Sequence, residues 1–281
     1  MITANNKAAE VSSNDCVPGS VWSYISPSRL NCWMSCPLKF KLRYIDGIRT
    51  PTTPALFLGK VVHAGLEIYY RHQQLGITLE SNDVVTRMLD SWNQAADEED
   101  MRFETVEQEA RLKEQANQLV ATYLRQQSDD KPRPLAVEVT MEAPLIDPVT
   151  GEDLGIPLLG VVDLIADAGD GATVIDFKTS YRSGPPFEVI HEIQLSCYAY
   201  LYRLLTGKEE TGLEIHSLIK TKTPKLDRQC YPARSEQQFR RLFSVIREYL
   251  AALDSGKFNY RPGWACGMCD FRHKHCRTWS P

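Results

Sequence analysis

The sequence predicts an α/β fold, with a helical region in front of an α/β core. Three observations predict this class. Apolar residues recur at helical spacing up to about residue 127. Val, Ile and Leu then fill three short segments, and helical and strand patterns alternate from there to about residue 254. A chain of 281 residues is long enough to bury a full core within one domain.

The first quarter of the chain predicts an arm followed by helices. Residues 1–20 are polar and aperiodic, which is typical of a disordered arm. Ser26-Pro27 is typical of an N-cap followed by Pro at the first helical position, and Cys36-Pro37 breaks that helix before a second helical stripe reaches Ile45. Further helices are expected at 55–75, 81–96 and 102–127.

The strand-rich half begins with three expected strands, at 135–144, 156–167 and 172–179. The last two are joined by Ala168-Gly-Asp-Gly171, which is a hairpin signal. A helix at 187–206, a strand at 212–221 and a helix at 235–254 follow. We therefore expect a single domain over 21–281, divided into N-terminal helices (21–75), a helical insertion (76–131), a core (132–256) and a cysteine-rich tail (257–281).

Charge and composition restrict the possible classes of protein. The formal net charge of −4 gives no electrostatic indication of nucleic-acid binding, although Lys and Arg gather at 220–228 and in the tail. No apolar run is long enough to span a bilayer and the N-terminus lacks a signal-peptide pattern, so we expect a cytoplasmic protein without a membrane partner. Eight cysteines in a reducing compartment indicate metal or cluster binding more than disulfides.

Two carboxylates and a lysine form the candidate catalytic group. Asp176 and Lys178 stand two apart in an expected strand, so their side chains leave the same face. Asp163 lies in the preceding strand, and a short hairpin would bring it alongside Asp176. Paired carboxylates are ligands that Mg²⁺ and Mn²⁺ prefer. Such a metal can activate water and neutralise charge on a phosphate, and a nearby ammonium can stabilise that charge.

A less specific interpretation is also open, because Asp-x-Lys occurs often by chance. Asp163 and Asp176 would then face water with Lys178 as their salt-bridge partner. The apolar residues on both sides of each Asp favour the functional interpretation, since a charge buried without a partner is costly. Two further pieces lie in expected helices: His63, and Gln194 with Tyr198 four residues later on the same helical face. Taken singly, each is more typical of a half-buried or core residue.

In this order the residues resemble the RecB-like branch of the PD-(D/E)XK nuclease superfamily. The matching motifs are a helical His63, Gly160-Val-Val-Asp163, Asp176-Phe-Lys178-Thr179 and Gln194-Leu-Ser-Cys-Tyr198. The resemblance covers about residues 24–70 and 134–281. It implies a restriction-endonuclease-like core, in which a mixed central sheet is flanked by helices, and a metal-dependent nuclease activity.

The resemblance also implies roles for these residues. His63, Asp163 and Asp176 would bind the catalytic metal, with the Phe177 carbonyl as a further ligand. Lys178 would assist the attacking water, and Gln194 and Tyr198 would help to place the scissile strand or the lysine. Glu138, in the preceding strand, matches an acidic position often found there; we rank it lower because it could be an ordinary salt-bridging residue.

The cysteines of the tail form a second constellation. Cys266-Gly-Met-Cys269 is followed by Cys276, a spacing typical of a metal or cluster site. Cys36 is the candidate fourth ligand, and Cys32, one helical turn away, is its rival. Zinc, with His273 or His275 replacing one cysteine, is the alternative metal. The sequence resembles the subgroup with the AddB nuclease domain and the CRISPR-associated exonucleases, which implies that Cys36, Cys266, Cys269 and Cys276 hold a [4Fe–4S] cluster.

Together these features predict a DNA exonuclease that depends on Mg²⁺ or Mn²⁺ and acts on single-stranded ends. Its setting would be recombination, repair or CRISPR adaptation, with any helicase or adaptation partner on a separate chain. The alternative is a non-catalytic iron–sulfur or zinc module that binds nucleic acid with a partner helicase or nuclease. Trp264, Phe271 and Trp279 could stack on bases, or they could cover the cluster.

Overall fold

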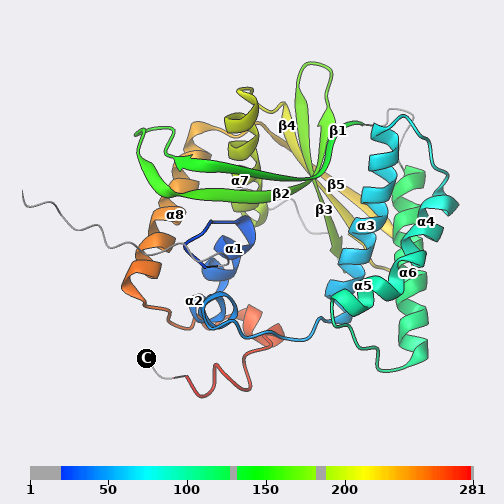
Figure 1. The fold of residues 1–281 in the computed structure, drawn as a ribbon, viewed down its shortest axis with the longest axis horizontal. Coiled ribbons are helices and arrows are strands. Elements are labelled where there is room, and N and C mark those ends of the chain that lie inside the picture. The colour runs from blue at the N-terminus through cyan, green and yellow to red at the C-terminus, as the bar shows by residue number, and fades with distance from the viewer. Residues whose placement is uncertain (1–19, 127–131, 182–187, 280–281) are drawn as a thin grey trace, which may run out of the picture.

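A five-stranded mixed sheet forms the centre of the molecule in the computed structural model, which describes residues 20–126, 132–181 and 188–279 (Figure 1). The strands follow one another across the sheet in sequence order. All neighbours pair antiparallel except β3 and β4, which are parallel. Their bounds are β1 Arg133–Ile146, β2 Asp153–Asp167, β3 Ala172–Ser180, β4 Gly212–Ile219 and β5 Lys225–Pro232.

The parallel pair is made possible by a helix, α7 (Glu188–Thr206), which connects β3 to β4. β2 and β3 instead form a hairpin, in which the Ala168 amide donates to the Gly171 carbonyl across the turn. The positive φ of 85° at Gly169 is the conformation that this tight connection needs, and glycine adopts it without strain. The turn sets the register of the hairpin, which pairs Ala172 with Asp167 and Ile175 with Leu164.

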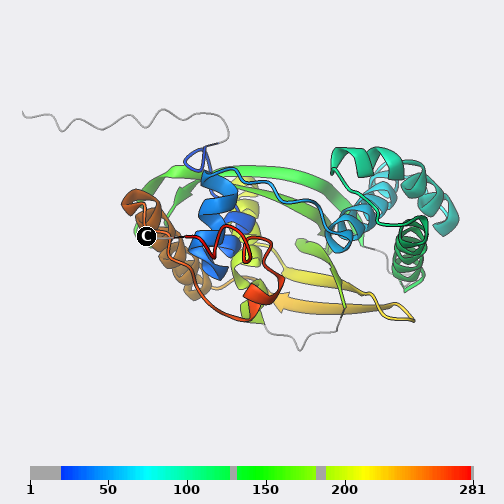
Figure 2. The ribbon, with the colours of Figure 1, turned by 90° about the horizontal axis from the view of Figure 1, so that it is seen from below.

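Helices cover the sheet in two groups, each with its own hydrophobic core (Figures 1 and 2). One group is α3 (Pro54–Gln74), α4 (Ser81–Asp90), α5 (Trp92–Glu98) and α6 (Val106–Gln126). Its core includes Phe177 and Leu164 from the sheet. The other group is α1 (Pro27–Ser35), α7 and α8 (Glu236–Ser255), and it packs on Val174 and Ile215. The central strand β3 is therefore buried on both faces.

The two ends of the described chain meet beside α2 (Pro37–Phe40) and the π-helical turn Lys41–Ile45. The Leu38 amide donates to the Asn259 carbonyl, and Leu38, Leu42 and Phe271 form a small third core. Figure 2 shows the C-terminal segment, with its short 3₁₀ turn Trp264–Met268, lying across the N-terminal helices. The N-terminal helix begins as expected, since the Ser26 side chain accepts from the Arg29 amide and Pro27 is the first helical residue.

Several boundaries differ from the sequence-based prediction. The expected helix 81–96 is two helices that divide at Ser91, and the helix expected from 102 begins at Val106. The strand β5 was not predicted, because its segment was interpreted only as a basic stretch. Residues 1–19 of the expected arm lie outside the described part of the chain. No helix among the described residues is long and apolar enough to cross a membrane.

Candidate active site

The candidate site lies where β2 and β3 separate. Backbone pairing between these strands ends at Leu164 and Ile175, so the next opposed residues are Asp163 and Asp176. There the Asp163 Oδ2 atom accepts a hydrogen bond of 2.7 Å from the Phe177 amide. A carboxylate thus takes the place of a backbone acceptor at this point, the separation of β2 and β3 beside Asp163 and Asp176, which we call the fork. This fixes one oxygen of Asp163 and leaves the other free to face the opening between the strands.

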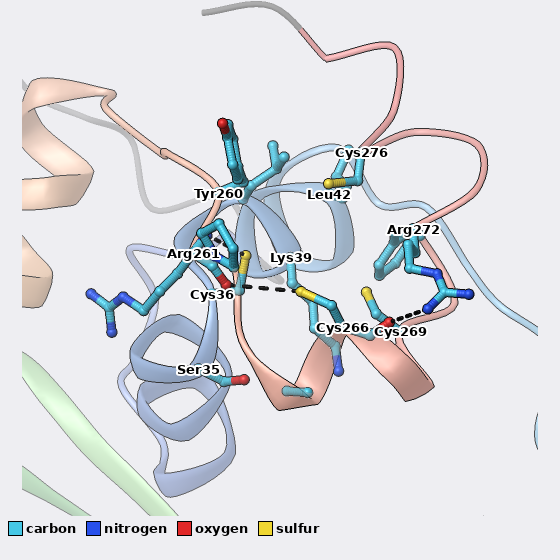
Figure 3. Close-up of a pocket in the computed structure, with 14 residues that line it drawn as sticks. Ser35, Cys36, Lys39, Leu42, Tyr260, Arg261, Cys266, Cys269, Arg272 and Cys276 are labelled. Atoms are coloured by element: carbon cyan, nitrogen blue, oxygen red, sulfur yellow. Dashed lines mark hydrogen bonds between the residues drawn. The ribbon is translucent and has the colours of Figure 1, made fainter.

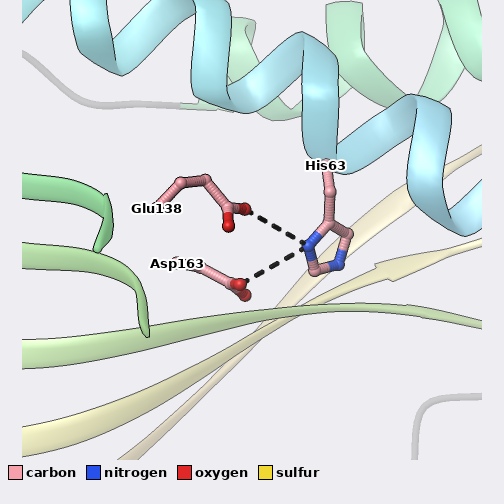
Figure 4. Close-up of side chains that lie close together, drawn as sticks. All are labelled: His63, Glu138 and Asp163. Carbon is pink, nitrogen blue, oxygen red and sulfur yellow. Dashed lines mark ion pairs between the residues drawn. The ribbon is translucent and has the colours of Figure 1, made fainter. Parts of the chain in front are cut away.

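His63 approaches this fork from α3 on one side and Glu138 approaches it from β1 (Figure 4). His63 Nδ1 lies 3.6 Å from Asp163 Oδ1 and 4.0 Å from Glu138 Oε1. One ligand atom from each of the three residues lies within 4.8 Å of the others. The three side chains therefore converge on one point, although they come from three separate elements.

Glu138 owes its position to an irregular backbone. Its φ is +44°, a left-handed conformation that residues other than glycine adopt at a cost. It interrupts the regular pairing of β1 with β2 between the pairs Val137–Leu164 and Val139–Val162. The distortion lies directly opposite Asp163. We ranked Glu138 low from the sequence, and the structure places it beside His63 and Asp163.

Asp176 forms the other half of the site with residues of its own strand and of α7. Only 2% of it is exposed, so the interpretation as a solvent-facing salt bridge is wrong. Its Oδ1 accepts from Gln194 Nε2 at 2.8 Å, and the same amide nitrogen lies 2.9 Å from the Tyr198 hydroxyl. Lys178 Nζ lies 2.6 Å from Asp176 Oδ2. The pattern Gln194-x-x-x-Tyr198 thus faces the Asp-x-Lys strand.

The electrostatics of the site are those of crowded, partly buried acids. Burial raises the pKa of Asp176, and the charge of Asp163 adds to this rise against the opposing effect of Lys178. Burial and Asp163 also raise the pKa of Glu138, to about 7. Burial alone would lower the pKa of His63, but its close contact with the Asp163 carboxylate and the charge of that residue raise it. Without a bound cation, the acids at the fork destabilise one another.

The residues present fit a divalent cation. Metal–oxygen bonds of about 2.1 Å allow ligand atoms up to about 4.2 Å apart across the ion. The two distances from His63 Nδ1 fall within that limit. Asp176 Oδ2 is fully buried and, apart from its ion pair with Lys178, has no hydrogen bond of good geometry among the described residues. A buried carboxylate oxygen with a spare lone pair is what a cation at this fork would satisfy.

Phe177 is held on the opposite face of β3 by an aromatic box. Its ring stacks on Tyr70 at 5.9 Å between centroids, and it meets Tyr123 and His216 at 5.5 and 5.9 Å. Tyr70, Tyr123 and His216 are linked through hydrogen bonds of 2.7 and 3.0 Å. The box fixes the backbone of the strand between Asp176 and Lys178.

A cleft of about 670 Å³ opens from His63 and Glu138 to the surface. Its walls come from α3, from the end of β3 and from the C-terminal turn, which contributes Met268. Tyr181 and Lys220 also line it, and Lys220 Nζ lies 4.2 Å from the centre of the Tyr181 ring. Neither residue was selected from the sequence. The only available signal was the basic stretch that contains Lys220.

The predicted cluster cysteines lie around one pocket, of about 120 Å³ (Figure 3). The pocket is lined by Cys36, Cys266, Cys269 and Cys276 but not by Cys32. The Arg261 amide donates to Cys36 Sγ at 3.4 Å, which ties the tail to the N-terminal helices.

The aromatic residues of the tail divide into two kinds. Phe271 is 1% exposed and lines this pocket, and Trp279 packs against the small core that contains Phe271. Trp264 is 86% exposed and remains available for contact with another molecule.

The chain is similar to a nuclease family in sequence and to a solved structure in fold. The sequence model of the PD-(D/E)XK nuclease superfamily matches residues 24–277. Among solved structures, a protein from Eubacterium rectale named "Putative exonuclease" is similar in fold, with a TM-score of 0.61, 13% identity and coverage of 98% of this chain and 96% of that one. The structure of SSO0001 has a TM-score of 0.45 at 15% identity, over 89% of this chain and 84% of that one. No curated protein matches the chain.

Proposed function

Because the chain belongs to the PD-(D/E)XK nuclease superfamily, we propose that it is a metal-dependent DNA exonuclease that acts on single-stranded ends. The observation that carries the proposal is the fork at Asp163 and Asp176, where His63 and Glu138 converge from one side and Lys178 and Gln194 from the other. Cation ligands, a cationic side chain and a hydrogen-bonding helix then surround one opening, as hydrolysis of a phosphodiester requires.

Each residue has a distinct part in this proposal. His63, Glu138, Asp163 and Asp176 would hold Mg²⁺ or Mn²⁺, with the Phe177 carbonyl as a further ligand, and the bound ion would lower the pKa of water and neutralise phosphate charge. Lys178 orients the attacking water and stabilises negative charge on the phosphate. Gln194 holds Asp176 Oδ1, and Tyr198 holds Gln194 in place.

The test is metal-dependent degradation of labelled DNA by the wild type and by two variants, Asp176→Asn and Lys178→Ala. We expect both variants to lose at least a hundredfold in rate while they remain folded by circular dichroism. EDTA should stop the wild type. Undiminished cleavage by both variants would refute the proposed site, and binding of DNA without degradation by the wild type would favour a non-catalytic module instead.

The preference for single-stranded ends is supported by the walls of the cleft. Leu56, Tyr181 and Met268 line it and are 59%, 63% and 78% exposed, so unstacked bases could lie against apolar and aromatic surface. Linear and circular substrates, each single- and double-stranded, separate the possibilities. We expect linear single strands to be degraded fastest and circular single strands to persist. Degradation of circular single strands as fast as linear ones would indicate an endonuclease.

A [4Fe–4S] cluster held by Cys36, Cys266, Cys269 and Cys276 is part of the same proposal. Zn–S bonds of about 2.3 Å place the sulfurs of a tetrahedral zinc site about 3.8 Å apart. The four sulfurs surround a cavity and do not form such a compact group among the described residues. Lys39, Arg261 and Arg272 also line the pocket, and their charge suits a cluster bound by four thiolates.

Iron content and visible absorption test the cluster. The purified protein should be brown and should lose its colour in Cys269→Ser. The matched control is Cys230→Ser, because Cys230 is exposed on β5 and lies outside the pocket. Colourless protein with stoichiometric zinc would instead support zinc with His273 or His275 as a ligand.

The biological setting belongs to the proposal as well. Recombination, repair and CRISPR adaptation all require processing of DNA ends, and a helicase or adaptation protein would be a separate partner. Co-purification from cells, followed by identification of the bound chains, separates these settings.

A further inference from the structure

Lys220 stands at the junction of two hollows on the surface. It follows the last residue of β4, and its amide donates to the Ser180 carbonyl at the end of β3. It lines the cleft that opens from His63 and Glu138 to the surface, which we call the catalytic cleft. It also lines a second groove, of about 690 Å³, which is described next. The two hollows therefore adjoin at this one side chain.

The second groove runs between α6 and the turn from β4 to β5. Its floor is a polar face of α6 whose members recur at helical spacing, and its other wall is the turn. The lining side chains that carry N–H donors are, besides Lys220, Gln108, Arg111, Gln115, Gln118 and Lys222. α6 is fixed against the sheet, because the Arg228 side chain donates to the carbonyl of Gln126 at the helix end.

The positive charges of this groove are available to a ligand. Within the part of the chain that the structure describes, no ion pair with a carboxylate joins Arg111, Lys220 or Lys222. Lys220 is 8% exposed and contacts the Tyr181 ring, which holds its ammonium at the junction. Glu114 is the one acid in the lining among the described residues, and it accepts a hydrogen bond from Gln118.

We propose that this groove, which we call the α6 groove, binds the phosphate backbone of the nucleic-acid strand whose end lies in the catalytic cleft. Lys220 would contact a phosphate where the strand passes from one hollow to the other, and Tyr181 offers a ring on which a base can stack there. The inference rests on the proposed nuclease function and names the path of its substrate beyond the catalytic centre.

The chemistry of the groove favours a polynucleotide strand over a small anion. Arg111 and the side-chain amides are spread along three turns of α6, from Gln108 to Gln118, and Lys220 and Lys222 face them from the turn, which suits several phosphates in succession. Side-chain amides and ammonium groups contact phosphates without reading bases. An exonuclease that moves along a strand needs contacts of this sequence-independent kind. The groove would also supply the positive field that the net charge of −4 does not predict.

The test is binding of single-stranded oligonucleotides of 4 to 20 nucleotides to the full chain, in EDTA, by fluorescence anisotropy. The variant is Arg111→Ala with Lys222→Ala. The matched control is Lys208→Ala with Lys257→Ala, which removes the same charge from exposed positions; Lys208 precedes β4, at the opposite end of that strand from Lys220.

We expect wild-type affinity to rise with length and the variant to show a smaller rise. Each phosphate contact adds about 0.7 to the slope of log affinity against log salt. Loss of two contacts should lower the slope by about 1.4, which corresponds to about 25-fold weaker binding of the 20-mer at 0.1 M salt. The control should keep the wild-type slope and affinity.

A variant that keeps the wild-type length dependence and salt slope would overturn the proposed path. Failure of the nuclease proposal would look different, because the wild type would then cleave none of the oligonucleotides in Mn²⁺. Stronger loss of duplex than of single-strand binding in the variant would also overturn the inference, since the groove would then hold a double helix.

Discussion

Glu138→Gln should stabilise the protein without metal and inactivate it with metal. In the folded protein, burial and the charge of Asp163 raise the pKa of Glu138 to about 7 from its usual 4.5. The raised pKa means that the ionised side chain disfavours the folded state. The protonated side chain therefore stabilises the folded state relative to the ionised one. This contribution to stability is complete below pH 4.5 and is lost as the pH rises through 7. A neutral glutamine keeps the shape of the side chain and removes the charge at every pH.

The size of the effect follows from the same shift. One pKa unit is worth about 1.4 kcal/mol, so the ionised carboxylate costs roughly 3 kcal/mol at most. The side chain is 23% exposed and solvent screens its charge, which reduces the cost to about 2 kcal/mol. For a chain of this length that corresponds to a melting temperature about 3 °C higher for the variant.

Thermal unfolding in EDTA at pH 5 and pH 8.5 measures this difference. We expect the variant to melt above the wild type at both pH values, and by a clearly larger margin at pH 8.5 than at pH 5. Mn²⁺ at pH 8.5 should raise the melting temperature of the wild type more than that of the variant, because the variant lacks one anionic ligand. Glu142→Gln, at an exposed position on the same strand, is the control. The reasoning would be refuted if the variant melts at or below the temperature of the wild type at pH 8.5. It would also be refuted if the variant melts above the wild type by the same margin at both pH values.

Two further substitutions test the packing behind the site. Gly160→Ala should cost about 1–2 kcal/mol and slow cleavage, because the added Cβ would lie 2.9 Å from Leu201 Cδ1 and 3.2 Å from the Tyr198 ring; unfolding and rate measurements on one preparation check both effects. Arg203→Met should cost about 3 kcal/mol in chemical denaturation, since it leaves Glu210 buried without its bonds of 2.7 and 2.8 Å. Arg240→Met, which removes an exposed ion pair, should cost less than about 1 kcal/mol.

The fork at the centre of the site could be predicted because hairpin geometry is local. The turn Ala168-Gly-Asp-Gly171 fixes the register, and that register places Asp163 opposite Asp176 whatever surrounds them. The face shared by Gln194 and Tyr198 follows from helical spacing in the same way. His63 comes from a separate element, and only the order of motifs connected it to the fork. Sequence spacing alone could not show that His63 lies close to Asp163.

The features that sequence reasoning missed depend on long-range structure. The sequence could not place Glu138 beside His63 and Asp163, because its direction is set by a φ of +44°, which no residue pattern reveals. The edge strand β5 has charged or polar residues at four of its first five positions and pairs with one neighbour only, so its apolar signal is weak. The helix break at Ser91 has neither glycine nor proline to mark it. In each case tertiary packing, and not local preference, decides the outcome.

The negative net charge is reconciled with a nucleic-acid substrate if two regions divide the task of binding it. At the fork, Glu138, Asp163 and Asp176 would repel a phosphate until a cation neutralises them. Binding without metal must then come from elsewhere, and the α6 groove with Lys220 is the cationic surface that adjoins the cleft. The salt dependence of binding in EDTA should therefore report on the groove alone. The further affinity gained when Mn²⁺ is added should disappear in Asp176→Asn and persist in the groove variant.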